Sequence, residues 1–357
     1  MKVGVIGCGN ISGIYFENGM KLPGLEIVAV ADMDMERARA TADKQGIARA
    51  LTVDAMIADS EVEAILNITT PDGHAPLNIR ALEAGKHAYV EKPLALDLAD
   101  GVAQVELARR KGLRLGGAPD TVLGAGIQTC RKLLDDGGIG EVFGGNAVML
   151  GGGVETWHPN PVFYYKKGGG PMFDMGPYYL TALVTLLGPV KRVMGATRKA
   201  HARRTITSQP FAGQVIDVEI PTHVAGLLEF QSGAVVTMTT SFDCMGGSRI
   251  PPIELYGSEG TLAVPDPNTF GGPVQVRRRG EREWSDVALT HGHDANARGI
   301  GLSDMAEAIA QKRPHRASGE LMLHVLEVMH AFHVSSDAGA PVEIKNQCPR
   351  PEAMPPL

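Results

Sequence analysis

The chain has 357 residues, more than one ordinary domain holds, so we expect two domains. Its net charge of −6 argues against a nucleic-acid partner, and no apolar run is long enough to cross a bilayer. The four cysteines lie far apart without a C-x-x-C pair, which predicts no disulfide framework and no metal site. No leader segment precedes the first predicted strand, so we expect a cytoplasmic protein without a membrane partner.

A dinucleotide-binding unit is predicted at the start of the chain. Its elements are an apolar strand at 2–6, a glycine turn at 7–12, a helix at 11–20 and a strand at 25–31 that ends at Asp32. Gly7 allows a tight turn, and Gly9 lets the backbone approach a pyrophosphate at the positive end of the helix. Asp32 can accept hydrogen bonds from the adenosine ribose and would repel a 2′-phosphate, which favours NAD over NADP. Ser12 replaces the third glycine of the usual fingerprint and is small enough for helix–strand packing.

The alternation of helices and strands continues to about residue 118. We predict helices at 35–45, at 75–84 and from a cap at Asp97 to about 111, and strands at 64–66, 87–90 and 113–115. Each unit has about the length that a right-handed parallel crossover needs. The sequence therefore predicts an α/β domain, a doubly wound parallel sheet of Rossmann type, over residues 1–120.

Beyond residue 120 the pattern changes. Helices are predicted at 121–135, 177–187, 302–312 and 319–336, and strands that alternate with period two at 222–230, 234–242, 253–256 and 261–264. Short turns join the strands in pairs. This pattern predicts an α+β domain with a large, mostly antiparallel sheet over residues 121–346, followed by an extended tail at 347–357.

Glu91, Lys92 and Pro93 follow the strand predicted at 87–90. Ligands of open α/β sheets bind at the carboxyl ends of the strands, so Lys92 can reach the nicotinamide end of a bound dinucleotide. Desolvation and an oxidised nicotinamide lower the pKa of an ammonium, which suits this lysine to exchange a proton with a substrate hydroxyl. An ordinary surface turn after a strand is the competing interpretation of these three residues alone.

The chain resembles, over essentially its whole length, the Gfo/Idh/MocA family of oxidoreductases, named for glucose–fructose oxidoreductase and inositol dehydrogenase. Three stretches carry the resemblance: the glycine turn with Asp32, then His74 followed by AGKHAYVEKPLA at 84–95, and GGGPMFDMGPY at 168–178. The resemblance implies an NAD-dependent enzyme in which Lys92 is catalytic and lies close to the nicotinamide. The residues that we assign to the cofactor site are Gly7, Gly9, Asn10, Ile11, Asp32, Thr70, His74, Glu91 and Lys92.

The third stretch departs from the family pattern. Many members carry D-x-G-x-x-x-H or D-x-G-x-H, with the aspartate and histidine in substrate binding and proton transfer, but Tyr178 stands at the histidine position of the shorter form. Either Tyr178 exchanges the proton, with its pKa lowered by a nearby ammonium, or Lys92 does so alone and Tyr178 positions a sugar. Our hypothesis makes Lys92 the main acid/base, assisted by Tyr178 and Asp174.

An aromatic stretch and one acid complete the predicted substrate site. Trp157, His158 and Tyr165 precede the glycine-rich run, and aromatic faces beside polar groups suit a carbohydrate ring. Two interpretations of His158 stay open. It contacts substrate or serves as an alternative proton carrier, or it is an ordinary loop histidine. Asp120 follows the last predicted parallel strand, where its carboxylate can bind hydroxyl groups.

We therefore expect an NAD-dependent oxidoreductase that transfers a hydride between the nicotinamide and a secondary alcohol of a sugar, glycoside or cyclic polyol. The resemblance also implies a homodimer or homotetramer, paired through the outer face of the second-domain sheet. Two alternatives stay open. One is a redox-neutral glycosidase that uses tightly held NAD for transient oxidation, and the other is a non-catalytic NAD or sugar sensor.

Overall fold

The computed structural model describes residues 1–357, and the chain divides into two compact units. The first unit comprises residues Met1–Leu123 and Asn296–Leu326, and the second comprises Gly124–Ala295 and Glu327–Leu357. The first segment of the first unit ends at Leu123, whereas the sequence analysis divides the chain after residue 120. The prediction differs for residues 296–326, which it placed in the second domain.

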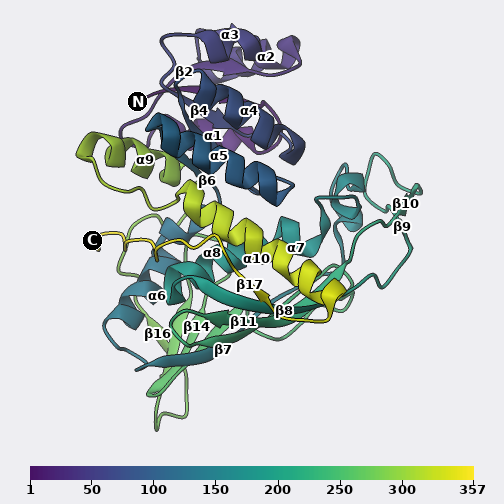
Figure 1. The fold of residues 1–357 in the computed structure, drawn as a ribbon, viewed down its shortest axis with the longest axis vertical. Helices are drawn as coiled ribbons and strands as arrows, with labels where there is room; N and C mark the ends of the chain where they lie inside the picture. Colours follow the sequence, from purple (N-terminus) through teal and green to yellow (C-terminus); the bar gives the residue numbers. More distant parts are fainter. The chain divides into compact units, whose positions relative to one another are not determined.

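The first unit is built on a six-stranded parallel sheet. Its strands are β1 (Lys2–Ile6), β2 (Glu26–Ala31), β3 (Ala50–Leu51), β4 (Ala64–Asn67), β5 (His87–Val90) and β6 (Leu115–Gly117), in the order β3-β2-β1-β4-β5-β6 (Figure 1). The strand order reverses between β1 and β4, so crossovers leave the sheet on opposite sides there. This topology is the doubly wound Rossmann arrangement that the sequence predicts. Strand β3 was not predicted, because no apolar run marks it in the sequence.

The helices of the first unit cover both faces of this sheet. They are α1 (Ser12–Gly19), α2 (Met35–Gln45), α3 (Val53–Ala58), α4 (Pro71–Glu83), α5 (Leu98–Lys111) and α9 (Ile300–Gln311). Along β1, Val3 and Val5 pack into one core with Phe16, while Ile6 packs into the other with Met56. The alternation of strand side chains between faces explains this division.

The helix predicted at 35–45 has these bounds in the structure. Its N-cap Asp34 accepts a hydrogen bond from the backbone N–H of Glu36 (3.0 Å), and Gly46 ends the helix in the left-handed conformation. Helix α4 begins at Pro71, four residues before the predicted start. Proline is well suited to the first turn of a helix, where no N–H partner is needed.

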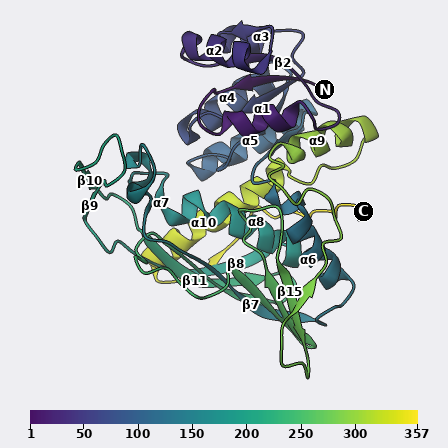
Figure 2. The ribbon, with the colours of Figure 1, turned by 180° about the vertical axis from the view of Figure 1, so that it is seen from behind.

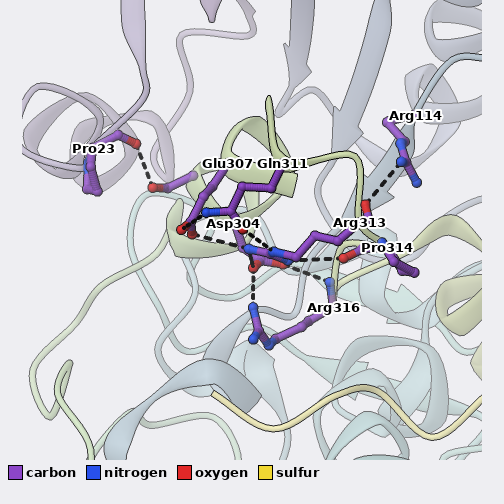
Figure 3. A network of polar contacts seen from close by, with 9 residues as sticks. Pro23, Arg114, Asp304, Glu307, Gln311, Arg313, Pro314 and Arg316 are labelled. Carbon is purple, nitrogen blue, oxygen red and sulfur yellow. Dashed lines mark hydrogen bonds and ion pairs between the residues drawn. The ribbon is translucent and has the colours of Figure 1, made fainter. Parts of the chain in front are cut away.

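Residues 296–326 belong to the first unit because they bury apolar side chains and cover its sheet edge. Leu302 and Met305 of α9 are buried in the same core as Val3 and Val5. At the edge strand β6, the Gly117 N–H donates to the Ala317 carbonyl (3.1 Å), so the exposed edge is partly paired. Asp304, only 3% exposed, anchors the connection to the following helix by ion pairs with Arg313 (2.9 Å) and Arg316 (Figure 3).

The second unit is built on a nine-stranded sheet of order β16-β15-β14-β13-β7-β12-β11-β8-β17. The strands are β7 (Val142–Leu150), β8 (Val190–Arg198), β11 (His223–Phe230), β12 (Val235–Ser241), β13 (Ile253–Gly257), β14 (Gly260–Val264), β15 (Val274–Arg278), β16 (Ser285–Val287) and β17 (Val342–Glu343). Only the pair β7 and β12 is parallel, and every other pair is antiparallel. The predicted large, mostly antiparallel sheet is confirmed.

Helices lie on one face of this sheet, and the other face carries none (Figures 1 and 2). The helices are α6 (Ala125–Asp135), α7 (Gly170–Asp174), α8 (Gly176–Leu187) and α10 (Gly319–Ala338), of which residues 327–338 belong to this unit. Phe332 of α10 packs so tightly on the sheet that a Cβ at Gly195 would lie 2.4 Å from its carbonyl oxygen. None of the helices in the chain has the length and apolar character needed to cross a membrane.

The single helix predicted at 121–135 is broken in two. Residues Thr121–Leu123 form a 3-10 turn (η1), Gly124 is extended, and α6 begins at Ala125. A Cβ at Gly124 would lie 2.6 Å from the Phe270 carbonyl oxygen, so the backbone passes close to another segment there. This long-range contact, which has no local sequence signal, overrides the helical pattern.

A small lobe completes the second unit beside the large sheet. It contains two 3-10 turns, η2 (Val154–Thr156) and η3 (Val162–Tyr165), and a two-stranded antiparallel ribbon of β9 (Arg203–Thr205) and β10 (Val215–Asp217). Figures 1 and 2 show the ribbon projecting from one side of the sheet. The lobe carries the aromatic stretch predicted to contact substrate.

Candidate active site

The glycine turn joins β1 to α1, and its two glycines differ in what surrounds them. Gly7 has φ 110°, and a Cβ there would lie 2.7 Å from the Ile68 carbonyl oxygen, so the fold itself requires glycine. At Gly9 a Cβ would meet no atom within 4 Å. The fold therefore gives no reason for glycine at position 9, whereas a pyrophosphate lying against the backbone does. Ser12 donates from Oγ to the Gly9 carbonyl (2.7 Å), so this departure from the fingerprint stabilises the turn.

Asp32 lies beside this turn at the end of β2. Its Oδ2 accepts a hydrogen bond from the Cys8 N–H (2.8 Å), and its Oδ1 accepts one from the Asp34 N–H (3.0 Å). The Arg37 guanidinium lies 3.6 Å from Oδ1 and is 54% exposed. The carboxylate is thus fixed next to the turn, where the sequence analysis expects it to bind a ribose. Asn10 and Ile11 are exposed on the same turn.

The buried side chains of Glu91 and His74 hold the backbone of Lys92 and Pro93 at the carboxyl end of β5. The Glu91 carboxylate accepts a hydrogen bond from the Lys92 backbone N–H at Oε2 (2.9 Å). The His74 ring lies with Nδ1 2.7 Å from the Pro93 carbonyl oxygen and Nε2 3.1 Å from that of Thr69. Burial lowers the pKa of His74, and the two carbonyl contacts oppose this effect. His74 therefore supports the backbone of the site from within the core.

The loop before α4 is fixed by a buried amide network that the sequence analysis did not single out. Asn67, Asn78 and Gln104 are all fully buried. Asn67 donates to Asn78 (3.0 Å), which donates to Gln104 (2.8 Å), and Asn67 also accepts from the Thr69 hydroxyl (2.7 Å). Thr70 follows as an exposed residue at the N-cap position of α4. Asn67 immediately after an apolar strand was the available sequence signal.

Asp120 lies inside the first unit instead of facing a ligand. It is 1% exposed, and its Oδ2 accepts hydrogen bonds from the backbone N–H groups of Gly299 (2.8 Å) and Gly301 (3.0 Å). Burial raises the pKa of Asp120 to about 6, although the two amides oppose the rise. These contacts speak against the predicted binding of substrate hydroxyls, because the carboxylate caps the start of α9.

The third motif lies across the junction of two helices in the second unit. Asp174 is half-buried at the end of α7, and Tyr178 is 7% exposed in the first turn of α8. A Cβ at Gly176, between them, would lie 2.7 Å from Met172 Sδ, so the junction is closely packed at this glycine.

The aromatic stretch separates into an exposed part and a buried part. Trp157 is 65% exposed, and its ring lies 5.4 Å from that of His158 in an edge-on arrangement. His158 Nδ1 accepts a hydrogen bond from the Asn160 N–H (3.0 Å). Tyr165, by contrast, is fully buried, and its hydroxyl donates to Glu155. Its predicted role in substrate binding is therefore not supported by its position, because the ring belongs to the core of the lobe.

That core contains a buried arginine that the sequence analysis missed. Arg204, 3% exposed, donates to Glu155 (2.6 Å) and forms a second ion pair with Asp243. Its guanidinium lies 5.5 Å from the centre of the Tyr165 ring. The network joins η2, β9 and the segment after β12, which holds the loop that bears Trp157 and His158. No local pattern distinguishes Arg204 from its exposed neighbour Arg203.

Comparison with known proteins agrees with the fold of the two units and with the sequence motifs. Residues 1–117 match the model of an oxidoreductase family with an NAD-binding Rossmann fold, and residues 127–263 match the GFO/IDH/MocA C-terminal domain. The chain therefore belongs to the Gfo/Idh/MocA family of oxidoreductases, as its motifs predict. It is a dehydrogenase or reductase of this family, with NAD as its cofactor and with relatives that act on sugars and polyols.

Two curated relatives illustrate the family. The dTDP-3,4-didehydro-2,6-dideoxy-alpha-D-glucose 3-reductase of Streptomyces violaceoruber is 33% identical over 87% of this chain and 95% of its own length. Inositol 2-dehydrogenase 3 of Saccharopolyspora erythraea is 30% identical over 80% of this chain and 79% of its own. One relative is named for a nucleotide-linked sugar and the other for a cyclic polyol.

Solved structures show the same fold. An NAD-binding oxidoreductase from Klebsiella pneumoniae superposes with a TM-score of 0.85 at 22% identity, covering 97% of this chain and 99% of that one. A levoglucosan dehydrogenase in complex with NADH and levoglucosan gives a TM-score of 0.82 at 19% identity, with coverage of 97% and 99%. The predicted fold class is confirmed.

Proposed function

We propose that the protein interconverts a secondary alcohol and a ketone on a sugar, glycoside or cyclic polyol, with Lys92 as the main acid/base. The observation that carries the proposal is the fixed backbone of Lys92 at the carboxyl edge of the parallel sheet. Glu91 holds this backbone from one side and His74 from the other. A lysine in a nucleotide-binding fold that is held in this way is suited to proton transfer.

The residues of the first unit suit the cofactor of the family. The open space over Gly9 and the N-terminus of α1 accommodate a pyrophosphate, and Asp32 is placed to accept hydrogen bonds from a ribose. Bound NAD supplies the acceptor and donor of the hydride. The exposed Arg37 lies 3.6 Å from both Asp32 and Asp34, so two carboxylates oppose its pairing with a 2′-phosphate, which supports the preference for NAD over NADP.

Proton transfer is assigned to side chains of the chain itself. In the oxidative direction neutral Lys92 accepts the proton of the substrate hydroxyl, and in the reductive direction its ammonium returns the proton to the carbonyl oxygen. Asp174 and Tyr178 are proposed to bind and orient the substrate hydroxyls, with Tyr178 assisting the proton transfer. Trp157 and His158 are proposed as further sugar contacts, because Trp157 is exposed on the lobe and His158 beside it is half-buried.

We also propose that the protein assembles as a homodimer or homotetramer through the helix-free face of the nine-stranded sheet. Met194, Leu227 and Val235 are exposed apolar residues on strands of this sheet. Met194 and Leu227 lie directly opposite each other on β8 and β11. Exposed apolar side chains that adjoin on a sheet face favour burial against a second copy.

The test of the activity is nicotinamide absorbance with purified protein, NAD or NADP, and a panel of sugars, inositols and glycosides, with product analysis of the same samples. Reduced nicotinamide that appears with one substrate class, and is lost in Lys92→Ala, supports the proposal. Cleaved glycoside with a silent absorbance trace identifies the redox-neutral glycosidase. Silence in both measurements leaves the non-catalytic sensor as the better account.

A further inference from the structure

Tyr15 is a buried tyrosine on α1, the helix that follows the glycine turn, and neither the family motifs nor the proposed mechanism uses it. It is 1% exposed and packs in the core that also contains Val3 and Leu302. Its hydroxyl donates a hydrogen bond of 2.7 Å to Glu91 Oε1. A side chain from the nucleotide-binding helix thus reaches the residue next to Lys92.

Glu91 receives two donors, one on each carboxylate oxygen. Oε1 accepts from the Tyr15 hydroxyl and Oε2 accepts from the Lys92 backbone N–H (2.9 Å). Because Glu91 is 8% exposed, little water is available to replace either donor. The two hydrogen bonds therefore fix the rotation of the carboxylate as well as its position.

The charges around this carboxylate are coupled. Glu91 raises the pKa of His74 and the Lys92 ammonium lowers it, so both charges lie within electrostatic range of the same imidazole. Burial, and then the charge of Glu91, raise the pKa of Tyr15 far above its usual range. Tyr15 therefore stays protonated and remains a donor throughout the range in which the enzyme works. Asp120 and Tyr89 are the other titratable groups that act on Tyr15.

We propose that Tyr15 is a positioning residue, whose hydroxyl holds the Glu91 carboxylate and thereby fixes the Lys92 backbone and sets the basicity of the Lys92 amine. This inference rests on the proposed role of Lys92 as the acid/base. It links the helix that starts at the dinucleotide turn to the residue that transfers the proton. Tyr15 itself touches neither the proton nor the substrate in this account.

The sign of the effect follows from the chemistry of the carboxylate. Without the Tyr15 hydroxyl, Glu91 loses one donor, carries more negative charge on Oε1 and is free to rotate. A less stabilised anion close to Lys92 favours the ammonium, so the pKa of the Lys92 amine rises. The limb of the kcat/KM profile that depends on neutral lysine then moves to higher pH, and turnover at neutral pH falls.

The test compares Tyr15→Phe with Tyr89→Phe in the full-length, NAD-bound protein. Tyr89 is the matched control because it is also fully buried in this unit and its hydroxyl contacts a carboxylate, that of Asp120 (3.4 Å). The Lys92 amine is titrated by NMR after reductive ¹³C-methylation, and its signal is identified by its loss in Lys92→Arg. Melting temperatures and the Kd of NAD are measured on the same samples.

The proposal predicts that the Lys92 pKa rises by about 0.5 or more in Tyr15→Phe and stays within ~0.2 of the wild type in Tyr89→Phe. The profile of kcat/KM should move in the same direction, with kcat at neutral pH lowered about threefold or more and the Kd of NAD within about twofold. An unchanged Lys92 pKa in Tyr15→Phe, or an equal change in both variants, would overturn it.

Two features of the design keep the outcome decisive. The amine titration needs no substrate. If the wild-type protein shows no turnover with any substrate, the proposed function is rejected, but the effect of Tyr15 on the Lys92 pKa can still be measured. If Tyr15→Phe does not fold, Glu91→Gln removes the negative charge while an amide oxygen remains to accept a hydrogen bond. The Lys92 pKa is then expected to fall, because the anion that favours the ammonium is gone, and an unchanged Lys92 pKa would count against the proposal.

Discussion

At the scale of a single residue, a substitution at Gly9 can test binding of the cofactor without disturbing the fold. Because a Cβ at this position would meet no protein atom within 4 Å, Gly9→Ala should leave the melting temperature unchanged. The methyl group would occupy the space of the pyrophosphate, so we expect the Kd of NAD to rise at least about tenfold, about 1.4 kcal/mol. Calorimetric titration with NAD measures this, with Gly13→Ala, equally open but within α1, as the control. Equal NAD affinity in the two variants would mean that the pyrophosphate does not lie over Gly9.

Asp32 is proposed to favour NAD over NADP. Arg37 lies 3.6 Å from its carboxylate and 3.6 Å from that of Asp34, so Asp32→Ser removes one of the two anions beside an exposed guanidinium, which can then pair with a 2′-phosphate. We expect this single substitution to raise kcat/KM with NADP and lower it with NAD, so that their ratio changes by about 10- to 100-fold. Steady-state kinetics with both nucleotides tests it. If adding Arg37→Ala does not reverse the gain with NADP, another group must bind the phosphate.

Asp120 gives the stability of the first unit a pH dependence of unusual sign. The pKa of its carboxyl is raised to about 6 in the folded chain, above its unfolded value, so the folded state binds the proton more tightly. This residue alone should therefore lower the unfolding free energy by up to ~3 kcal/mol as pH rises from about 4 to about 6, with no further change above that. Asp120→Asn keeps an oxygen acceptor for the two amides and should abolish this part of the slope. Urea unfolding across this pH range compares the two proteins, and identical slopes would contradict the assignment.

At the scale of the elements, the lobe that carries Trp157 and His158 depends on Arg204. Arg204→Met would leave Glu155 and Asp243 as buried, unpaired charges, which costs ~3–5 kcal/mol. Arg203→Met removes only an exposed pair with Asp217, 75% and 71% exposed, and should cost less than ~1 kcal/mol. Urea unfolding monitored by tryptophan fluorescence distinguishes the two variants. Similar losses in both would show that the Arg204 network does not stabilise the lobe.

Most helices and strands could be predicted, because the signals that define them lie within the elements and at their ends. The helix at 35–45 and the strand at 87–90 have clear caps, turns and apolar patterns, and the structure has the same bounds. The break at Gly124 and the membership of 296–326 depend on contacts between distant segments, which no local pattern contains. The same limit explains the misplaced Asp120 and Tyr165 and the missed Tyr15, since burial of a polar side chain is decided by its long-range neighbours.

At the scale of the whole molecule, the helix-free sheet face should decide the oligomeric state. Replacing Met194 and Leu227, which face each other across β8 and β11, by glutamate places charges in the proposed contact. We expect the double variant to elute as a monomer in size-exclusion chromatography with light scattering, while the wild type elutes as a dimer or tetramer. The same substitutions at Val215 of β10 and at Met245 in the segment after β12, both exposed, serve as the control. A wild-type monomer would remove the proposed assembly.

The central claim is that Lys92 exchanges a proton in an NAD-dependent reaction, and Lys92→Arg tests it most directly. Arginine keeps a positive charge in place but cannot be deprotonated, so binding is preserved while acid/base chemistry is not. The measurement is the pH profile of kcat/KM for the substrate found in the panel, with the Kd of NAD determined in parallel. We predict that turnover falls by two or more orders of magnitude, that the limb assigned to lysine disappears, and that NAD still binds. A Lys92→Arg enzyme with wild-type turnover and an unchanged profile would contradict the account.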